Sequence, residues 1–160
     1  MNAPVTVYVP RDSAATSVGA DEVADELLRA AVRIGRPIRV IRNGSRGMLW
    51  LEPLVEVVTP EGRIGYGPVT PGAVDDLVAA GLLDGADHPS RVGVVEDLPW
   101  LATQDRVTFA RVGVTDPLSA NDYLSRGRSE QGCTARARRR SSSAYGRNLS
   151  VSGISEASAA

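Results

Sequence analysis

Few residues in this chain are of the types that carry out catalysis or bind metal ions. The sequence has one histidine, His88, one cysteine, Cys133, and no lysine. No histidine or lysine base stands at a recognisable spacing from Ser13, Ser17 or Ser45, so nucleophilic catalysis is not expected. A single thiol excludes an intrachain disulfide and any metal cluster that needs several thiolates from this chain. The sequence therefore predicts no catalytic, cofactor-binding or metal-binding residue.

One glycine-bearing loop, Asn43–Gly47, could still bind a ligand, because consecutive N–H groups near a glycine turn can converge on a phosphate. A phosphate-binding P-loop, however, needs Gly-Lys-Ser/Thr opening a helix, which is absent here. Arginine, methionine and tryptophan are enriched at interfaces, so four residues of this region are candidates for contact with another subunit. They are Arg42, Arg46, Met48 and Trp50. The alternatives are exposed salt bridges for the arginines and core positions for the apolar residues.

The loop lies within a regular series of predicted strands and helices. Strand-like patterns occupy Val5–Val9, Ile38–Ile41, Leu54–Val58 and Arg63–Val69, and helical spacing occupies Val23–Ile34 and about Pro71–Leu83. This β-α-β-β-β-α order predicts an α/β fold in which helices pack on a small mixed sheet. Further along, Val107–Val114 is strand-like, and Ser119 could cap a short helix over Ala120–Leu124.

The distribution of charge predicts where the folded part ends. Residues 1–124 contain 11 arginines and 17 acidic residues, whereas residues 125–160 contain 7 arginines and 2 acidic residues. The last 36 residues have no apolar periodicity, and we expect an Arg/Ser-rich disordered tail there. This tail could contact nucleic-acid phosphates, but it lacks interleaved aromatic residues and a fold, so nucleic-acid binding is not expected. No apolar run is long enough for a membrane span, and we expect a cytoplasmic protein.

Two sets of motifs carry a resemblance to known families. The segment Leu54–Leu82, with its Pro-Glu-Gly turn and Tyr-Gly-x-Val-Thr-Pro sequence, resembles thioredoxin-like ferredoxins. In those domains, cysteines in the loops after the first two strands hold a two-iron cluster. The corresponding loops here, Pro10–Ala20 and Arg42–Trp50, contain no cysteine. The resemblance therefore implies a thioredoxin-like domain without cluster cysteines.

A longer match covers about residues 5–127. The segments RNGSRGMLWLEPLVEVVTP (Arg42–Pro60), GYGPVTP (Gly65–Pro71) and RVTFARVGVTDPLSANDYLSRG (Arg106–Gly127) resemble the N-terminal part of the β subunit of soluble, molybdenum-type, NAD-dependent formate dehydrogenases. That subunit is similar to the flavoprotein subunit of respiratory complex I, with a thioredoxin-like domain in front. The family passes electrons from formate through iron–sulfur centres and FMN to NAD, and its partners are the other formate dehydrogenase subunits.

The resemblance implies three segments. Residues 1–86 are expected to form the thioredoxin-like domain, residues 87–124 a linker and the start of a missing flavoprotein domain, and residues 125–160 the tail. No FMN, NAD or iron–sulfur motif of the family occurs here, so we expect a structural, subunit-docking domain that holds no cofactor. A stand-alone interaction module, or a subunit of a related NAD-reducing hydrogenase or NADH:quinone oxidoreductase, remains an alternative.

The tail departs from the family where a helix should begin. Back-translation of Gln131–Ala137 with GC-rich codons, shifted by one base, can give a sequence similar to that helix. We therefore hypothesise that the residues from about Arg128 onward are a frameshift product.

Overall fold

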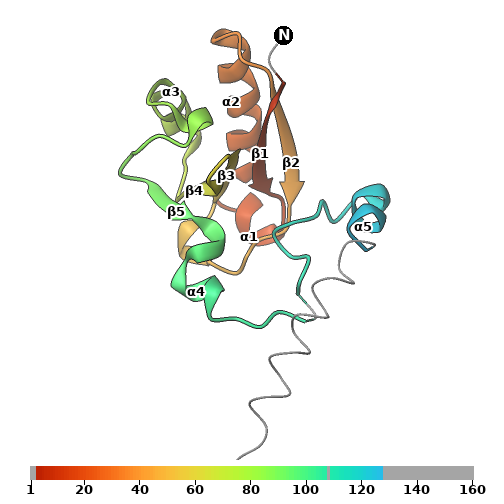
Figure 1. Ribbon diagram of the computed structural model, residues 1–160. Helices are drawn as coiled ribbons and strands as arrows, with labels where there is room; N and C mark the ends of the chain where they lie inside the picture. Colours follow the sequence, from red (N-terminus) through yellow and green to blue (C-terminus); the bar gives the residue numbers. More distant parts are fainter. Residues whose placement is uncertain (1–2, 108, 128–160) are drawn as a thin grey trace, which may run out of the picture. The chain divides into compact units, whose positions relative to one another are not determined.

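The computed structural model describes residues 3–107 and 109–127 (Figure 1). Residues 125–127, predicted as the start of the tail, belong to the last helix, whereas the rest of the predicted tail, with Cys133, lies outside the described residues. The chain divides into one compact unit that ends at Tyr123 and a second that begins at Leu124. No helix in the described part of the chain is long and apolar enough to cross a bilayer.

A five-stranded mixed sheet forms the centre of the domain. Its strands are β1 (Val5–Pro10), β2 (Ile38–Asn43), β3 (Val55–Thr59), β4 (Gly62–Tyr66) and β5 (Arg91–Val94). They lie in the order β2-β1-β3-β4-β5. β1 and β2 are parallel, and the other neighbouring pairs are antiparallel. The carboxyl ends of β1 and β2 therefore reach the same edge of the sheet, where the loops that follow them can meet.

Helices and short helical turns connect the strands. The α-helices are α1 (Ser13–Thr16), α2 (Ala20–Arg33), α3 (Val74–Ala79), α4 (Pro99–Ala102) and α5 (Ala120–Gly127). The 3₁₀ turns are η1 (Leu49–Leu51), η2 (Pro71–Ala73), η3 (Leu82–Asp84) and η4 (Val95–Asp97). α2 runs alongside β1 and β2 and also contacts α3 (Figure 1).

The pattern of buried side chains explains why the sequence folds this way. β1 places Val7 and Val9 fully inside, and α2 buries Val23 and Leu27 one helical turn apart. These residues share one aliphatic core with side chains from β3, β4, α3 and η3. Burial of a single large aliphatic side chain stabilises a fold by about 1.5–3 kcal/mol. The predicted α/β fold, with helices packed on a small mixed sheet, is confirmed.

Two predicted elements differ in the structure. The helix expected over Pro71–Leu83 is divided into η2, α3 and η3, because Gly81 adopts a left-handed conformation (φ 94°) that ends α3. The strand expected over Val107–Val114 is wrong, since the described residues from 109 to 114 form turns. The short helix after Ser119 is confirmed, with the Ser119 Oγ accepting the Asp122 N–H at 3.1 Å.

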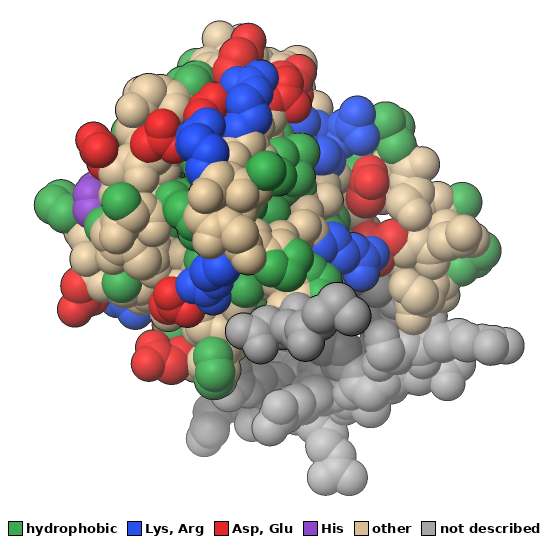
Figure 2. Space-filling view, turned by 90° about the horizontal axis from the view of Figure 1, so that it is seen from above, with side chains coloured by type: hydrophobic (Ala, Val, Ile, Leu, Met, Phe, Trp, Pro, Cys, Tyr) green, Lys and Arg blue, Asp and Glu red, His purple; other side chains and the backbone are tan. Residues whose placement is uncertain are grey.

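Ion pairs cover the surface where α2 approaches α3 and η3. Arg33 pairs with Glu26 at 2.8 Å and also with Asp75. Arg36 forms a two-point contact with Asp84, at 2.6 and 2.9 Å. Figure 2 shows arginine and acidic side chains next to one another on the face seen from above. This arrangement is typical of a solvated surface.

Candidate functional site

The two loops that follow β1 and β2 meet through one carboxylate. Asp12 is the N-cap of α1, and its Oδ1 accepts the N–H groups of Ala14 and Ala15 at 3.1 and 3.3 Å. Its Oδ2 accepts the N–H of Ser45, in the second loop, at 2.7 Å. Both oxygens of Asp12 are thus engaged, and direct hydrogen bonds to this carboxylate join the two loops.

Ser45 continues this polar chain toward Glu52. Its hydroxyl donates to Glu52 Oε1 at 2.6 Å and accepts the N–H of Gly47 at 3.0 Å. Glu52 Oε2 accepts the N–H of Leu54 at 3.0 Å. Burial raises the pKa of the Glu52 carboxyl, and the two hydrogen bonds from Ser45 and Leu54 oppose this shift. The N–H groups of Ser45 and Gly47 therefore donate inside the domain, which leaves the predicted anion nest without those two donors.

Arg46, which belongs to the second loop, has its side chain in a buried ion-pair network. Its Nε and one terminal nitrogen each contact a carboxylate oxygen of Glu56 at 2.8 Å, as a two-pronged fork. The same terminal nitrogen contacts Glu96 at 2.9 Å. Only 7% of Arg46 and 1% of Glu56 is exposed. Burial tends to lower the pKa of Arg46, but its contacts with Glu56 and Glu96 outweigh it, and the pKa is raised.

A second arginine shares the same carboxylate. Arg63 on β4 contacts Glu56 at 2.9 Å, and its guanidinium lies 3.6 Å from the centre of the Tyr8 ring. Burial, and the neighbouring charge of Arg46, lower the pKa of Arg63, while Glu56 opposes the shift. Arg63 also donates to the carbonyl of Gly113 at 2.9 Å. The network thus reaches the segment that follows α4.

This segment, residues 103–107 and 109–119, is here named the C-terminal strap. The Gly113 carbonyl accepts a second hydrogen bond from the buried Asn43 Nδ2 at 2.9 Å. Arg106 donates to the backbone carbonyl of Arg46 at 2.8 Å. A side chain at Gly113, which has a φ of +80°, would lie 2.5 Å from Arg46 Cγ. Glycine is therefore required where the strap passes over Arg46.

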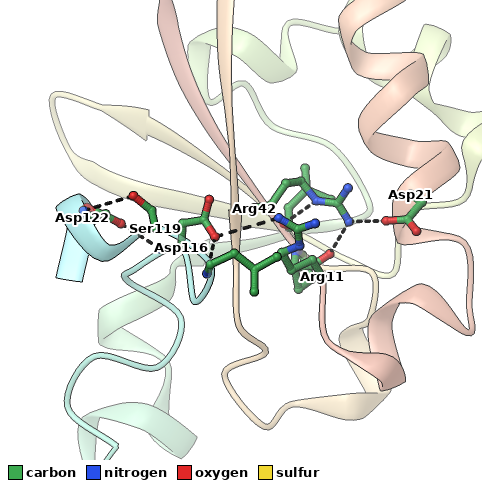
Figure 3. Close-up of polar contacts among 9 residues, drawn as sticks. Arg11, Asp21, Arg42, Asp116, Ser119 and Asp122 are labelled. Carbon is green, nitrogen blue, oxygen red and sulfur yellow. Dashed lines mark hydrogen bonds and ion pairs between the residues drawn. The ribbon is translucent and has the colours of Figure 1, made fainter.

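Figure 3 shows a second set of polar contacts, in which the ion pair of Arg11 and Asp116 joins the first loop to the strap. Arg11 lies 4.0 Å from Asp116, whose N–H donates to Asp122 at 2.8 Å. Arg42 on β2 contacts Asp21 at 2.6 Å and the carbonyl of Pro10 at 3.0 Å. Hydrogen bonds and ion pairs thus hold the strap against both loops.

An open groove of about 710 Å³ runs between the second loop and the strap. Its walls carry apolar and aromatic side chains together with a few polar ones. They are Ser45, Arg46, Gly47, Trp100, Gln104, Asp105, Arg106, Val107, Phe109 and Val112. At its edge, the rings of Trp50 and Trp100 meet edge to face, with centroids 5.5 Å apart. The groove has the size and composition typical of ligand sites.

The structure separates the four residues predicted for subunit contact. Trp50 is 59% exposed, and Arg42 is half-buried beside Asp21. Arg46 is buried in its ion pairs, and Met48 is 1% exposed in a small apolar cluster with Leu54 and Val95. Trp50 is thus the most accessible of the four, and contact of any of them with a subunit stays a prediction.

Sequence reasoning missed other residues that build this region. Glu56 stands between Val55 and Val57 in an apolar run, and an acid at that position signals a buried partner. The groove residue Arg106 gave no local signal, because it lies in a segment with little regular structure.

The residue types fit neither a metal site nor an iron–sulfur cluster. No group of three histidine, cysteine, aspartate or glutamate side chains that could hold a metal ion occurs among the described residues. The two joined loops offer carboxylates, a hydroxyl and guanidinium groups, whereas an iron–sulfur cluster needs thiolates. His88 is half-buried in a loop, where its Nδ1 accepts the N–H of Ser90 at 3.1 Å.

No protein-family profile and no curated protein matches the chain. Among solved structures, it is similar to a thioredoxin-like [2Fe-2S] ferredoxin from Aquifex aeolicus, at 21% sequence identity and a TM-score of 0.44, covering 54% of this chain and 86% of that one. A second structure of a wild-type thioredoxin-like [2Fe-2S] ferredoxin from the same organism has 19% identity and a TM-score of 0.46, covering 57% of this chain and 99% of that one.

Proposed function

We propose that this domain is a subunit-docking domain, related to the N-terminal part of the β subunit of NAD-dependent formate dehydrogenases, and that it holds no redox cofactor of its own. The observation that carries the proposal is a set of exposed apolar side chains beside the two joined loops, here named the apolar patch. Its members are Leu49, Trp50, Trp100, Val107 and Phe109, which are between 52% and 81% exposed.

The apolar patch is unusual for a surface that faces only water. Exposed apolar residues are normal when scattered, but contiguous patches mark interaction sites. Trp50 and Trp100 touch each other, and Trp100, Val107 and Phe109 line the same groove. Tryptophan is enriched among the residues that contribute most to binding energy at interfaces. Association with another protein would remove this apolar area from water.

The loops beside the apolar patch favour docking over chemistry. Asp12, Ser45, Glu52 and Arg46 all engage partners within the domain. The sequence motifs that resemble the formate dehydrogenase β subunit support a partner among the other subunits of such a complex. In that assembly, FMN, NAD and iron–sulfur centres would belong to other segments or subunits, and this domain would position its neighbours.

A binding experiment with a matched control tests the proposal. The 160-residue chain would be co-expressed with the other formate dehydrogenase subunits of its source, and the recovered complex quantified by affinity capture. The double variant Trp50→Ala/Trp100→Ala is expected to lose most of the captured partner. Val32→Ala is the control, because Val32 is 81% exposed on α2 but lies outside the apolar patch. Capture that is equal for the double variant and the wild type would contradict docking through this patch.

A separate measurement tests the proposal that the domain holds no redox cofactor. The ultraviolet–visible spectrum of the purified chain is expected to show neither flavin nor iron–sulfur absorbance, and the same sample should not reduce a dye with NADH. Stoichiometric absorbance of either kind would refute a cofactor-free domain. Capture of subunits from an NAD-reducing hydrogenase instead would retain docking and change the parent complex.

A further inference from the structure

Three charged residues line the groove: Arg46, Asp105 and Arg106. Arg106 is the cation among them that forms no ion pair within the described residues. Its Nε donates to Gln104 Oε1 at 2.7 Å, and one terminal nitrogen donates to the Arg46 carbonyl at 2.8 Å. Both acceptors are neutral. Asp105 also lines the groove but forms no ion pair with Arg106. The other terminal nitrogen of Arg106 makes no hydrogen bond within the part of the chain that the structure describes.

The neighbouring arginine, Arg46, differs from Arg106 in how its charge is balanced. Partial burial, and the charge of Arg46, lower the pKa of Arg106. Arg46 itself has two carboxylate partners, Glu56 and Glu96. The two arginines thus differ: the charge of one is matched inside the domain, and the charge of the other is held by neutral acceptors at the wall of an open groove. A carboxylate that entered the groove would supply the missing counter-charge to Arg106, which can bind it with two parallel hydrogen bonds.

The remaining walls of the groove indicate which kind of side chain would bind next to that carboxylate. Trp100, Val107, Phe109 and Val112 provide apolar and aromatic surface next to Arg106. The groove is open and continues into the Trp50–Trp100 pair at its edge. A segment of polypeptide fits this shape better than a compact ion, because it can place one side chain on the aromatic wall and another against Arg106. Binding surfaces of this kind combine aromatic anchors with arginine.

We propose that the groove binds an acidic segment of a partner polypeptide, with an aromatic or aliphatic side chain against Trp100 and Phe109 and an adjacent carboxylate paired with Arg106. This inference rests on the proposed docking function and names the chemistry of the docked segment. In this proposal, the apolar walls provide most of the affinity, and Arg106 makes the groove prefer an acidic side chain over a neutral one of the same shape.

Two short peptides test the selection. The probes are acetyl-Phe-Asp-Leu-amide and acetyl-Phe-Asn-Leu-amide, which differ only in the charge of the central side chain. Each would be titrated into the full 160-residue chain, with the indole N–H signals of Trp50 and Trp100 followed by NMR. Because a hydrogen bond to a charged group is about twice as strong as a neutral one, the acidic peptide should bind about ten-fold more tightly. Equal affinities, or no shift with either peptide, would overturn the proposal.

Variants separate the two parts of the groove. Arg106→Gln should abolish the preference, so that the acidic and the neutral peptide bind with equal affinity. Arg106→Lys keeps the charge and should restore part of the preference. Trp100→Ala should weaken both peptides to the same degree. If Arg106→Gln reduces both affinities equally, Arg106 acts only in positioning the strap, and the proposal is wrong.

The same variants distinguish this inference from the docking function. A partner subunit that is captured by the wild type, lost in Trp50→Ala/Trp100→Ala and retained fully in Arg106→Gln would leave docking intact and refute recognition of an acid. Loss of capture in Arg106→Gln, with recovery in Arg106→Lys, would support both.

Discussion

The sheet with its helices and the C-terminal strap bury opposite kinds of groups. In the sheet and helices, Val7, Val57 and Leu77 are at most 2% exposed. In the strap, Val107 and Phe109 are 81% and 63% exposed, while a backbone carbonyl, that of Gly113, faces inward to donors of Asn43 and Arg63. Apolar burial is non-directional, whereas hydrogen bonds require one defined position. The strap is thus fixed in place by polar contacts while its apolar side chains remain available to another molecule.

The two regions meet at Glu56, so removing its charge should reduce the stability of the domain more than any other change considered below. In Glu56→Gln, the amide group would face donors of Arg46 and Arg63. Arg63 would lose its carboxylate partner, and Arg46 would keep Glu96 alone among the described acids. Breaking a buried ion pair by changing one partner costs about 3–5 kcal/mol. We expect a loss of this order in the free energy of unfolding, measured by urea denaturation followed by circular dichroism.

A surface acid provides the control for that measurement. Glu61 lies 3.8 Å from Arg91 and is 75% exposed. Glu61→Gln should leave the urea midpoint almost unchanged, because exposed ion pairs contribute little. Similar losses in the two variants would show that the buried network does not link the sheet to the strap.

Gly113→Ala should affect the strap more than the core. Its new Cβ would lie 2.5 Å from Arg46 Cγ, so the strap has to move. A non-glycine residue in the left-handed region also costs about 1–2 kcal/mol. Hydrogen-exchange mass spectrometry should show faster exchange in strap peptides and little change in peptides from β1 and β3.

Gly35→Ala separates the clash from the backbone strain. Gly35 also has a positive φ, of +67°, but a side chain there would meet nothing within 4 Å. This control should lose stability without faster exchange in the strap. Equal exchange in the strap for both variants would mean that the close approach at Gly113 does not hold the strap in place.

The same contrast explains what could be predicted from the sequence. The strands and helices of the core follow from local apolar periodicity, as in Val23 and Leu27 on α2. The network of Arg46 and Glu56 requires knowledge of which strands are neighbours. Asn43 and Gly113 are seventy residues apart, and no local pattern relates them. The apolar residues of 107–114 predicted a strand, but the directional contacts of Gly113 overrode that local preference.

Glu52 offers a smaller effect that depends on pH. Its pKa is raised by burial, so the folded state holds this proton more tightly than the unfolded state. Stability from this group is therefore greatest below the ordinary carboxyl range and falls as the pH rises toward the raised value. Relative to Glu52→Gln, which does not titrate, the wild type should lose stability over that range. Urea midpoints of both proteins at a series of pH values measure it; a difference that grows in the opposite direction would contradict a raised pKa.

The smallest effect is expected at the surface, in the pair of Arg36 and Asp84. The two contacts of 2.6 and 2.9 Å resemble the fork of Arg46, but the side chain of Asp84 is 64% exposed. The hydrogen bonds from Arg36 lower the pKa of Asp84, so its small contribution is present above the ordinary aspartate pKa and is lost as the pH falls through the lowered value. Because solvent screens exposed pairs, Asp84→Asn should cost about 0–1 kcal/mol. This cost should disappear at about 1 M salt, where the screening length is near 3 Å. The same salt should leave the cost of Glu56→Gln largely unchanged, since that pair is buried; a cost of Glu56→Gln that salt removes equally would show that Glu56 is reached by solvent.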